Sequence, residues 1–373
     1  MTEHGEKDRR TAQLAKRAAE STIDRLKRRN ATISTRDELD ATIAKIVQPG
    51  RGILAADEST PTITKRFKAV GIESTEETRR AYRSLLFTTR GAGEFVAAVI
   101  LFEETLGQKA DDGTLLSEVL VRQGIVPGIK VDKGTTPLPN SSGDLITQGL
   151  DGLAERLKGY KAQGARFAKW REVYGITDRN PTPLAIDANA EVLARYAAIC
   201  QGEGIVPIVE PEVLIDGDHT IERCHEVSEA VLHAVFHALH RHNVILEGMV
   251  LKPSMVLPGK ERAPKASPEV VAAATLEVLR RMVPAAVPTI NFLSGGQSPE
   301  EATANLNAMN LMAPNGAWVL SFSYARALQD PAMKTWAGRS ENVSAAQKAF
   351  YRRLKMNSLA CSGKYRAEME KAA

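Results

Sequence analysis

A lysine followed by a proline ends the apolar segment GMVLKPSM at residues 248–255. The three apolar residues before Lys252 are typical of a buried strand, and Pro253 cannot extend one. Lys252 therefore lies where a strand leaves the core. A single lysine in such a place is usually a surface residue, but one held partly out of water can attack a carbonyl carbon.

More lysines and several carboxylates lie at the ends of other apolar segments. Lysines brought together disfavour one another's charged form, so one amine could be neutral near pH 7 and form a Schiff base with a ketone. A carboxylate beside that amine can carry the protons that this reaction requires. The EPE of residues 210–212 would, taken alone, more often be a polar strand edge. The residues concerned are Asp57, Lys130, Lys169, Glu210, Glu212 and Lys252.

The segment SGGQSPEEA at residues 294–302 predicts an anion site. Its two glycines let backbone N–H groups approach a ligand. Ser298, Pro299 and Glu301 suit the N-cap, the first position and the capping box of a helix, and a helix N-terminus favours phosphate. Arg326, near the end of a later apolar segment, adds a planar cation. Taken alone, the segment would also suit an ordinary capped turn.

Eight apolar segments must position these residues. Each is followed by a stretch of helical character, such as residues 189–203 or 299–310. Several are continuous apolar runs, which are typical of strands buried on both faces. Eight strand-and-helix units predict an α/β protein with a closed (β/α)8 TIM barrel. An open doubly wound sheet is the runner-up, but the sequence has neither a Gly-x-Gly-x-x-Gly motif nor a P-loop. The segments are residues 52–59, 95–102, 125–131, 165–171, 204–214, 248–253, 288–296 and 318–326.

In such a barrel, the carboxyl ends of all the strands face one mouth. Lys169 and Lys252 lie on the fourth and sixth strands, so they can face each other with Glu210 of the fifth strand between them. Seven of the eight segments end in charged or phosphate-binding residues, which chance surface placement explains poorly. An amine, carboxylates and a phosphate site together suit carbon–carbon cleavage in a phosphorylated keto-sugar. The iminium accepts the electrons, so no metal ion or cofactor is expected.

Composition limits the class of protein further. The chain has 373 residues, of which 43% are hydrophobic and 25% charged, and a net charge of +4. Residues 1–30 contain nine Lys or Arg and five Asp or Glu, so they carry that whole excess. We therefore expect a basic helical or disordered extension over residues 1–32 and a single barrel domain over residues 33–373. A formally neutral barrel argues against a nucleic-acid partner.

The sequence also bears on the compartment. No apolar run approaches the roughly 18 residues that cross a membrane, so no membrane partner is expected. The N-terminal segment has no apolar stretch of the signal-peptide type and is too acidic for a transit peptide. Cys200, Cys224 and Cys361 form no CxxC pair and are predicted to be free thiols in a reducing cytoplasm.

The chain closely resembles the class I fructose-1,6-bisphosphate aldolases of animals and plants from about residue 35 to 366. The resemblance implies a (β/α)8 barrel, usually a homotetramer, that is cytoplasmic and acts in glycolysis and gluconeogenesis. It also implies reversible cleavage of fructose 1,6-bisphosphate to dihydroxyacetone phosphate and glyceraldehyde 3-phosphate through a lysine Schiff base, without a metal ion. The motifs that carry it are GILAADEST, ILFEETLGQKADDG, GIKVDKG, TQGLDGL, FAKWR, GIVPIVEPE, VLKP, FLSGGQS and FSYARALQ.

The same resemblance implies roles for individual residues. Lys252 would be the Schiff-base lysine, Glu210 the main general acid and base, and Glu212 an assistant in imine formation. Lys169 would stabilise negative charge on substrate oxygens, and Asp57 would position or deprotonate the C4 hydroxyl. The C1 phosphate would be held by Ser294, Gly295, Ala325 and Arg326, and the C6 phosphate by Ser59, Arg66 and Lys130.

Three positions depart from the family pattern. Pro61 and Thr62 replace the usual Gly-Ser, which removes a backbone N–H near the C6-phosphate residues. Ala325 replaces a usual glycine, and an alanine can serve there if its φ angle is negative. Animal members end in a tyrosine that enters the active site, whereas the last tyrosine here is Tyr365. These differences leave open the enamine proton donor and the preference for the bisphosphate over fructose 1-phosphate.

Three alternative functions remain open from the sequence. A metal-dependent aldolase would need a histidine cluster, and His233, His237 and His240 can share one helix face. That helix precedes the sixth strand, however, so it belongs to the outer ring of helices and not to the barrel mouth. A non-catalytic barrel could bind a partner through residues 1–30. Another Schiff-base aldolase could act on a different phosphorylated sugar, such as sedoheptulose 1,7-bisphosphate.

Overall fold

The computed structural model describes residues 35–371, and the predicted extension over residues 1–32 lies outside them. Eight parallel strands form a closed barrel in the order β1-β10-β9-β8-β7-β6-β3-β2. Each of the eight predicted segments overlaps one of these strands, so the TIM barrel is confirmed and the open sheet is excluded. The barrel strands are β1 (Gly52–Ala56), β2 (Val96–Leu101), β3 (Val126–Lys130), β6 (Phe167–Tyr174), β7 (Val206–Val213), β8 (Val250–Leu251), β9 (Thr289–Phe292) and β10 (Val319–Tyr324).

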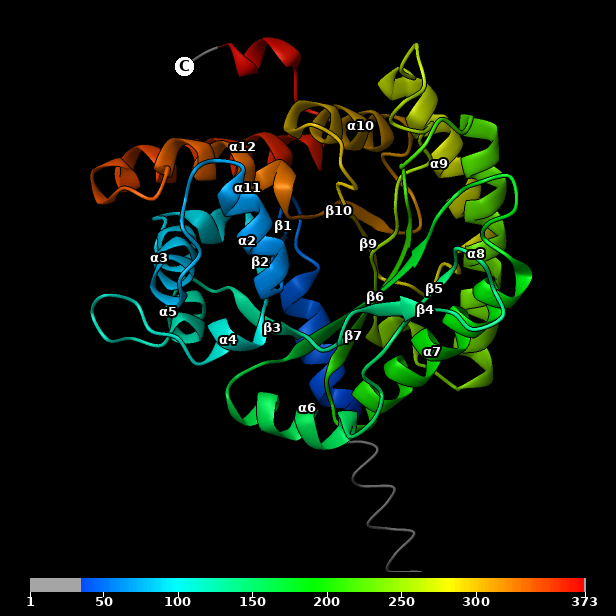
Figure 1. The fold of residues 1–373 in the computed structure, drawn as a ribbon, viewed down its shortest axis with the longest axis horizontal. Coiled ribbons are helices and arrows are strands. Elements are labelled where there is room, and N and C mark those ends of the chain that lie inside the picture. Colours follow the sequence, from blue (N-terminus) through cyan, green and yellow to red (C-terminus); the bar gives the residue numbers. More distant parts are fainter. Residues whose placement is uncertain (1–34, 372–373) are drawn as a thin grey trace, which may run out of the picture.

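Helices surround the strands on the outside (Figure 1). The two helices predicted from sequence correspond to α7 (Pro183–Gly202) and α10 (Pro299–Met312). Helix α7 begins earlier than predicted because Thr182 caps it and a proline follows at the first position. A helix over residues 35–46 precedes β1. The others are α2 (Thr60–Lys68), α3 (Glu76–Phe87), α4 (Glu103–Leu106), α5 (Leu116–Arg122), α6 (Leu153–Ala162), α7 (Pro183–Gly202), α8 (Ile221–Arg241), α9 (Pro268–Met282), α10 (Pro299–Met312), α11 (Arg326–Trp336) and α12 (Val343–Ala360).

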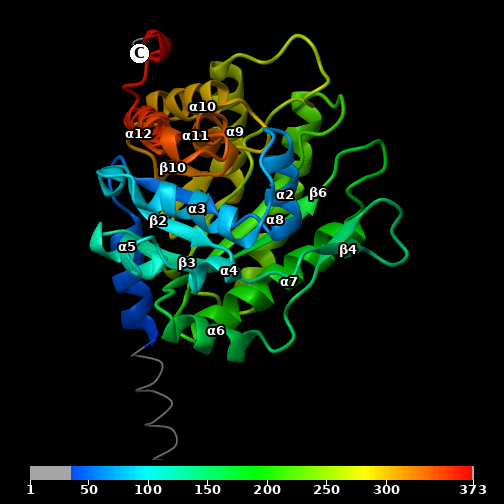
Figure 2. The same ribbon diagram turned by 60° about the vertical axis from the view of Figure 1, so that its left-hand side comes forward.

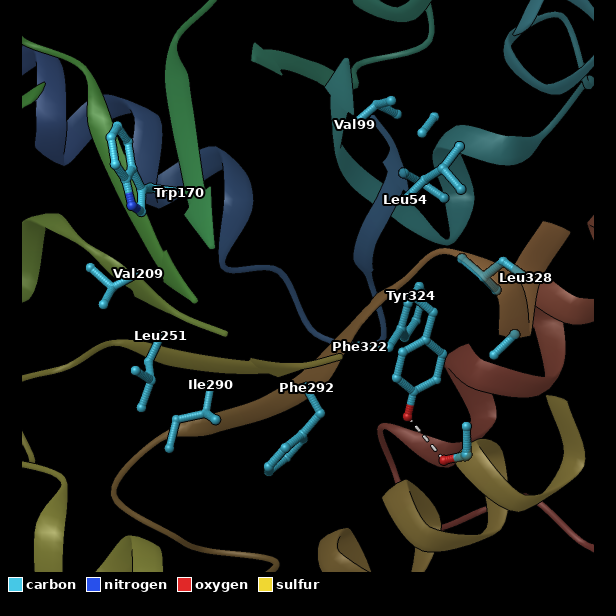
Figure 3. Close-up of a cluster of buried hydrophobic side chains, with 14 of the residues drawn as sticks. Leu54, Val99, Trp170, Val209, Leu251, Ile290, Phe292, Phe322, Tyr324 and Leu328 are labelled. Atoms are coloured by element: carbon cyan, nitrogen blue, oxygen red, sulfur yellow. Dashed lines mark hydrogen bonds between the residues drawn. The ribbon is translucent and has the colours of Figure 1, made fainter. Parts of the chain in front are cut away.

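Successive side chains of each barrel strand point to opposite faces of the sheet. They therefore contribute in turn to two apolar cores, one inside the barrel and one between the strands and the helices. The outward residues, which include Trp170, Val209 and Tyr324, belong to the core between strands and helices, and Figure 3 shows Tyr324 against α10. The Tyr324 hydroxyl there donates to the carbonyl of Ala302 at 2.9 Å and ties β10 to α10. The inward core includes Ile53, Ala55, Ala98, Ile100, Val126, Phe167, Val206, Ile208 and Val250. Further along the same strands, the inward positions become polar.

Strand β6 is longer than predicted. It continues past Arg171 to Tyr174, paired with β7 from Phe167–Val206 to Tyr174–Val213. The prediction failed because it ended the strand at the charged residues. A two-stranded antiparallel sheet, β4 (Thr135–Pro137) and β5 (Leu145–Thr147), was also missed. Figure 2 places α2, the end of β6 and β4 on one side of the molecule.

Gly128 shows how tightly the barrel interior is packed. A Cβ at this position would lie 2.3 Å from the ring of Phe167, at the paired position on β6. We expect Gly128→Ala to lower the free energy of unfolding by about 1–3 kcal/mol because the ring must move within a filled core. Urea unfolding measures this change. Gly159→Ala is the control, since it adds a Cβ in open space on α6 and should stabilise by about 0.5–1 kcal/mol.

Candidate active site

The twelve predicted site residues line one cavity of about 630 Å³ at the carboxyl ends of the strands, called here the central cavity. Period-two alternation explains the convergence of six of them, because Asp57, Lys130, Lys169, Glu210, Glu212 and Lys252 continue the inward rows of the apolar core. Asp57 follows β1 directly, and Lys252 follows β8. The twelve are Asp57, Ser59, Arg66, Lys130, Lys169, Glu210, Glu212, Lys252, Ser294, Gly295, Ala325 and Arg326.

A row of alternating charges occupies the centre of this cavity. Lys252 Nζ lies 2.9 Å from Oε1 of Glu210, and Lys169 Nζ lies 3.0 Å from Oε2 of the same carboxylate. Lys169 Nζ also lies 2.7 Å from Oδ2 of Asp57. Each of these four side chains is less than a tenth exposed, so the charges interact with little screening by water. Glu210 therefore contacts both amines at once.

The charge states follow from this arrangement. Burial alone would lower the pKa of Lys169, but Asp57 and Glu210 outweigh it and raise that pKa above its ordinary value. Burial alone would raise the pKa of Asp57, but Lys169 and Lys252 outweigh it and lower that pKa to about 2. The same two lysines lower the pKa of Glu210 against its burial. The sequence argument about crowded lysines was therefore incomplete, because the carboxylates between them favour the ammonium form of Lys169.

Three further charged residues of the site, Glu212, Lys130 and Arg66, are paired with oppositely charged side chains. Glu212 accepts from Arg171 Nε, and Lys130 is paired with Asp132. Arg66, expected at the C6 phosphate, lines the cavity but is bound by Glu58 and, at 2.7 Å, by Asp330 of α11. Its guanidinium therefore already has two carboxylate partners in this structure.

The predicted anion loop has the expected geometry. Gly295 and Gly296 have φ angles of +54° and +93°, which are strained for any other residue. The capping box between Ser298 and Glu301 is formed, so the N-terminus of α10 follows this loop directly. A Cβ on Gly296 would lie 3.4 Å from Nη2 of Arg326, at the start of α11. Gly295 and the Arg326 guanidinium thus line one end of the cavity, and Gly296 and the N-terminus of α10 follow directly after it in the chain.

Two of the three departures are accommodated by the backbone. Ala325 has a φ angle of −100°, so an alanine fits the place of the family's glycine. Pro61 lies in the first turn of α2, where a proline costs no helix hydrogen bond. The hydroxyls of Ser59 and Thr62 lie 3.1 Å apart. The third departure is the lack of a C-terminal tyrosine, since the last tyrosine of this chain is Tyr365. Its buried hydroxyl donates a hydrogen bond to Glu370, and burial raises the pKa of Tyr365 to about 12.

The sequence argument assigned no role to several other polar residues that line the cavity, among them Thr62, Lys65, Asp132, Arg171 and Ser323. Arg171 could have been found, since it lies two residues after Lys169 on the same face of β6. Ser323 likewise lies two residues before Ala325. Its hydroxyl is buried and has no hydrogen-bond partner among residues 35–371.

The histidine alternative gains no support from the fold. His233, His237 and His240 are exposed on α8, in the outer ring of helices, and none of them lines the central cavity. Within residues 35–371, no group of three or more His, Cys, Asp or Glu side chains is placed to hold a metal ion. The three cysteines are free, as predicted, and burial raises the pKa of the Cys200 and Cys361 thiols. The same part of the chain contains no helix long and apolar enough to span a bilayer.

The low pKa of Asp57 predicts a loss of stability in acid. Its pKa falls from an ordinary 3.8 to about 2 in the folded protein, so the unfolded state binds protons first. The contribution of the Asp57 carboxylate to the free energy of unfolding is therefore complete above about pH 4 and is lost as the pH falls through 2. We expect urea midpoints to drop between pH 4 and pH 2, with a smaller drop in Asp57→Asn. An equal drop in both proteins would contradict this assignment.

Comparison with known proteins agrees with this geometry. The family model of the glycolytic class-I fructose-bisphosphate aldolases matches residues 38–373. The chain is 57% identical to the cytosolic fructose-bisphosphate aldolase 6 of Arabidopsis thaliana, over 89% of this chain and 92% of that protein. It is 56% identical to the fructose-bisphosphate aldolase of Dictyostelium discoideum, over 89% and 94%.

A solved structure extends the likeness to three dimensions. The fructose-bisphosphate aldolase of Plasmodium falciparum, crystallised with TRAP and a small-molecule inhibitor, superposes with a TM-score of 0.88 at 51% identity. The match covers 90% of this chain and 96% of that one. The sequence motifs, the barrel and the central cavity are thus explained together: this chain belongs to the class-I fructose-bisphosphate aldolase family.

Proposed function

We propose that Lys252 forms a Schiff base with C2 of fructose 1,6-bisphosphate, and that the central cavity then cleaves the bond between C3 and C4. The observation that carries this proposal is the position of Glu210, which contacts both Lys252 and Lys169 beside the anion loop. The products are dihydroxyacetone phosphate and glyceraldehyde 3-phosphate, and the reaction is reversible. The protein is thus a lyase of glycolysis and gluconeogenesis.

Glu210 prepares the nucleophile. Its lowered pKa keeps it a carboxylate, so it can accept a proton from Lys252 at 2.9 Å and leave the amine free to attack the ketone. The attack produces a carbinolamine, and the proton held by Glu210 then leaves with the C2 hydroxyl as water. Glu212, two residues further along β7, assists this dehydration. The resulting iminium is the electron acceptor of the reaction.

Asp57 and Lys169 act on the bond that breaks. The Asp57 carboxylate takes the proton of the C4 hydroxyl, and the electrons of the C3–C4 bond move into the iminium to give an enamine. Lys169, held in its charged form, stabilises the negative charge that develops on the C4 oxygen. Glyceraldehyde 3-phosphate departs. Protonation of the enamine at C3 and hydrolysis of the iminium then release dihydroxyacetone phosphate.

The two phosphates occupy opposite ends of the cavity in this proposal. The anion loop with Arg326 binds the C1 phosphate through N–H donors and a guanidinium. Ser59 and Lys130 bind the C6 phosphate, and Arg66 joins them if it exchanges Glu58 for the ligand. The residues at the C1 phosphate are Ser294, Gly295, Ala325 and Arg326.

The assembly and compartment are part of the same proposal. Plant relatives such as the cytosolic aldolase 6 of Arabidopsis thaliana support a cytoplasmic enzyme. The family resemblance supports a homotetramer. Light scattering on the eluting peak of a sizing column tests this, since a monomer or dimer would refute the tetramer.

A coupled assay for triose phosphates tests the activity. We expect turnover of fructose 1,6-bisphosphate, with slower turnover of fructose 1-phosphate and of sedoheptulose 1,7-bisphosphate. Preference for the seven-carbon substrate would instead favour the alternative Schiff-base aldolase. The complete absence of turnover, together with partner binding through residues 1–30, would favour the non-catalytic alternative.

A further inference from the structure

Asp132 is a buried carboxylate that the mechanism above does not use. It lies two residues beyond the end of β3, lines the central cavity and is 8% exposed. Its Oδ1 pairs with Lys130 Nζ and accepts the backbone N–H of Gly134 at 3.2 Å. Lys130 Nζ also donates to the backbone carbonyl of Asp132 at 3.1 Å. Asp132 therefore engages two of the three donors of the ammonium group.

The position of Lys130 makes this pairing consequential. Lys130 is the residue of β3 paired with Lys169 of β6, so both lysines point into the barrel from neighbouring strands. Lys169 uses Asp57 and Glu210 as partners. The charge of Lys130 also acts on Asp57, whose pKa it helps to lower and whose proton transfer the reaction requires. Asp132 thus pairs with a cation that acts on the central row of charges.

A contribution to the stability of the fold explains the presence of Asp132 poorly. Its Oδ2 is buried and has no hydrogen-bond partner among the described residues. A buried carboxylate oxygen without a partner is a cost to folding, and such a cost is common where function demands the group. The Gly134 contact is a single neutral donor that many side chains at a turn could satisfy.

We propose that Asp132 is a positioning residue that holds Lys130 for the C6 phosphate and so sets the preference for a bisphosphate. This inference rests on the proposed function of the central cavity. Asp132 accepts hydrogen bonds from two of the N–H groups of the Lys130 ammonium and so fixes its position. The third N–H group is left to donate to an oxygen of the C6 phosphate. A substrate without a C6 phosphate gains nothing from that donor, so the effect of Asp132 depends on the substrate.

The test compares two substrates in Asp132→Asn, which keeps the shape and removes the charge. We expect kcat/KM for fructose 1,6-bisphosphate to fall about tenfold, mainly through KM, and kcat/KM for fructose 1-phosphate to change less than about twofold. Asp132→Glu should recover part of the loss. The matched control is Asp144→Asn, because Asp144 is also buried in the same loop region but interacts with Ser141, Asn180 and Thr182, which do not line the cavity.

A double-mutant cycle with Lys130→Met separates positioning from a structural role. If Asp132 acts through Lys130, Asp132→Asn should cause no further loss in the Lys130→Met background. The proposal is overturned if the loss persists there, if both substrates lose equally, or if neither changes. Melting temperatures of all variants identify a folding defect, which would affect both substrates alike. Failure of the proposed function is distinct, since the unmutated protein would then cleave neither substrate.

Discussion

Replacement of Lys252 by methionine should reduce kcat for fructose 1,6-bisphosphate by at least about 10⁴-fold, because it removes the amine that forms the Schiff base in the proposed mechanism. Methionine matches the lysine stem in length and packs well in a buried position, so the barrel should fold. The coupled triose phosphate assay measures the loss. Circular dichroism checks that the fold is unchanged.

The control for this variant is a lysine outside the cavity. Lys158 lies on α6, paired with Glu155 on the surface, and Lys158→Met should leave kcat within about twofold of the unmutated protein. If Lys252→Met keeps more than a tenth of the activity while it remains folded, the assignment of the nucleophile is wrong.

Replacement of Glu210 by glutamine should lower kcat by about 10²- to 10⁴-fold. The amide keeps the size of the side chain but cannot accept the proton of Lys252. It also leaves Lys169 with one carboxylate partner, Asp57, which weakens the interactions that raise the pKa of Lys169. We expect the acidic limb of the kcat profile against pH to move or disappear in this variant. Steady-state rates from pH 5 to pH 9 measure both effects.

Glu212→Gln is the matched control for Glu210→Gln. Glu212 lies two residues further along β7 and contacts Arg171 rather than either central lysine. We expect its loss in kcat to be at least about tenfold smaller than that of Glu210→Gln. Equal losses would mean that the two carboxylates share the proton transfers, and a larger loss in Glu212→Gln would reverse their proposed roles.

The barrel and the centre of the site could be predicted because both follow from local pattern. Continuous apolar runs indicate strands buried on both faces, and a period of two brings Lys169, Glu210 and Lys252 to one interior. The capping box of Ser298 and Glu301 is readable for the same reason, since its partners are three residues apart.

The features that escaped prediction depend on contacts between distant parts of the chain. Arg66 is bound by Asp330, a partner 264 residues away. The charged form of Lys169 depends on Asp57 and Glu210, which come from two other strands, so the distances had to be known. Strand β6 continues past Arg171 because β7 pairs with it, a contact that composition does not reveal.

Borohydride reduction in the presence of dihydroxyacetone phosphate, followed by peptide mapping, tests the central claim most directly. Reduction turns the iminium into a stable amine, so the modified residue is the one that formed the Schiff base. The account predicts a single adduct on Lys252, absent from Lys252→Met and from samples without the ketone. An adduct on Lys130 or Lys169 instead, or no adduct in an active sample, would contradict it.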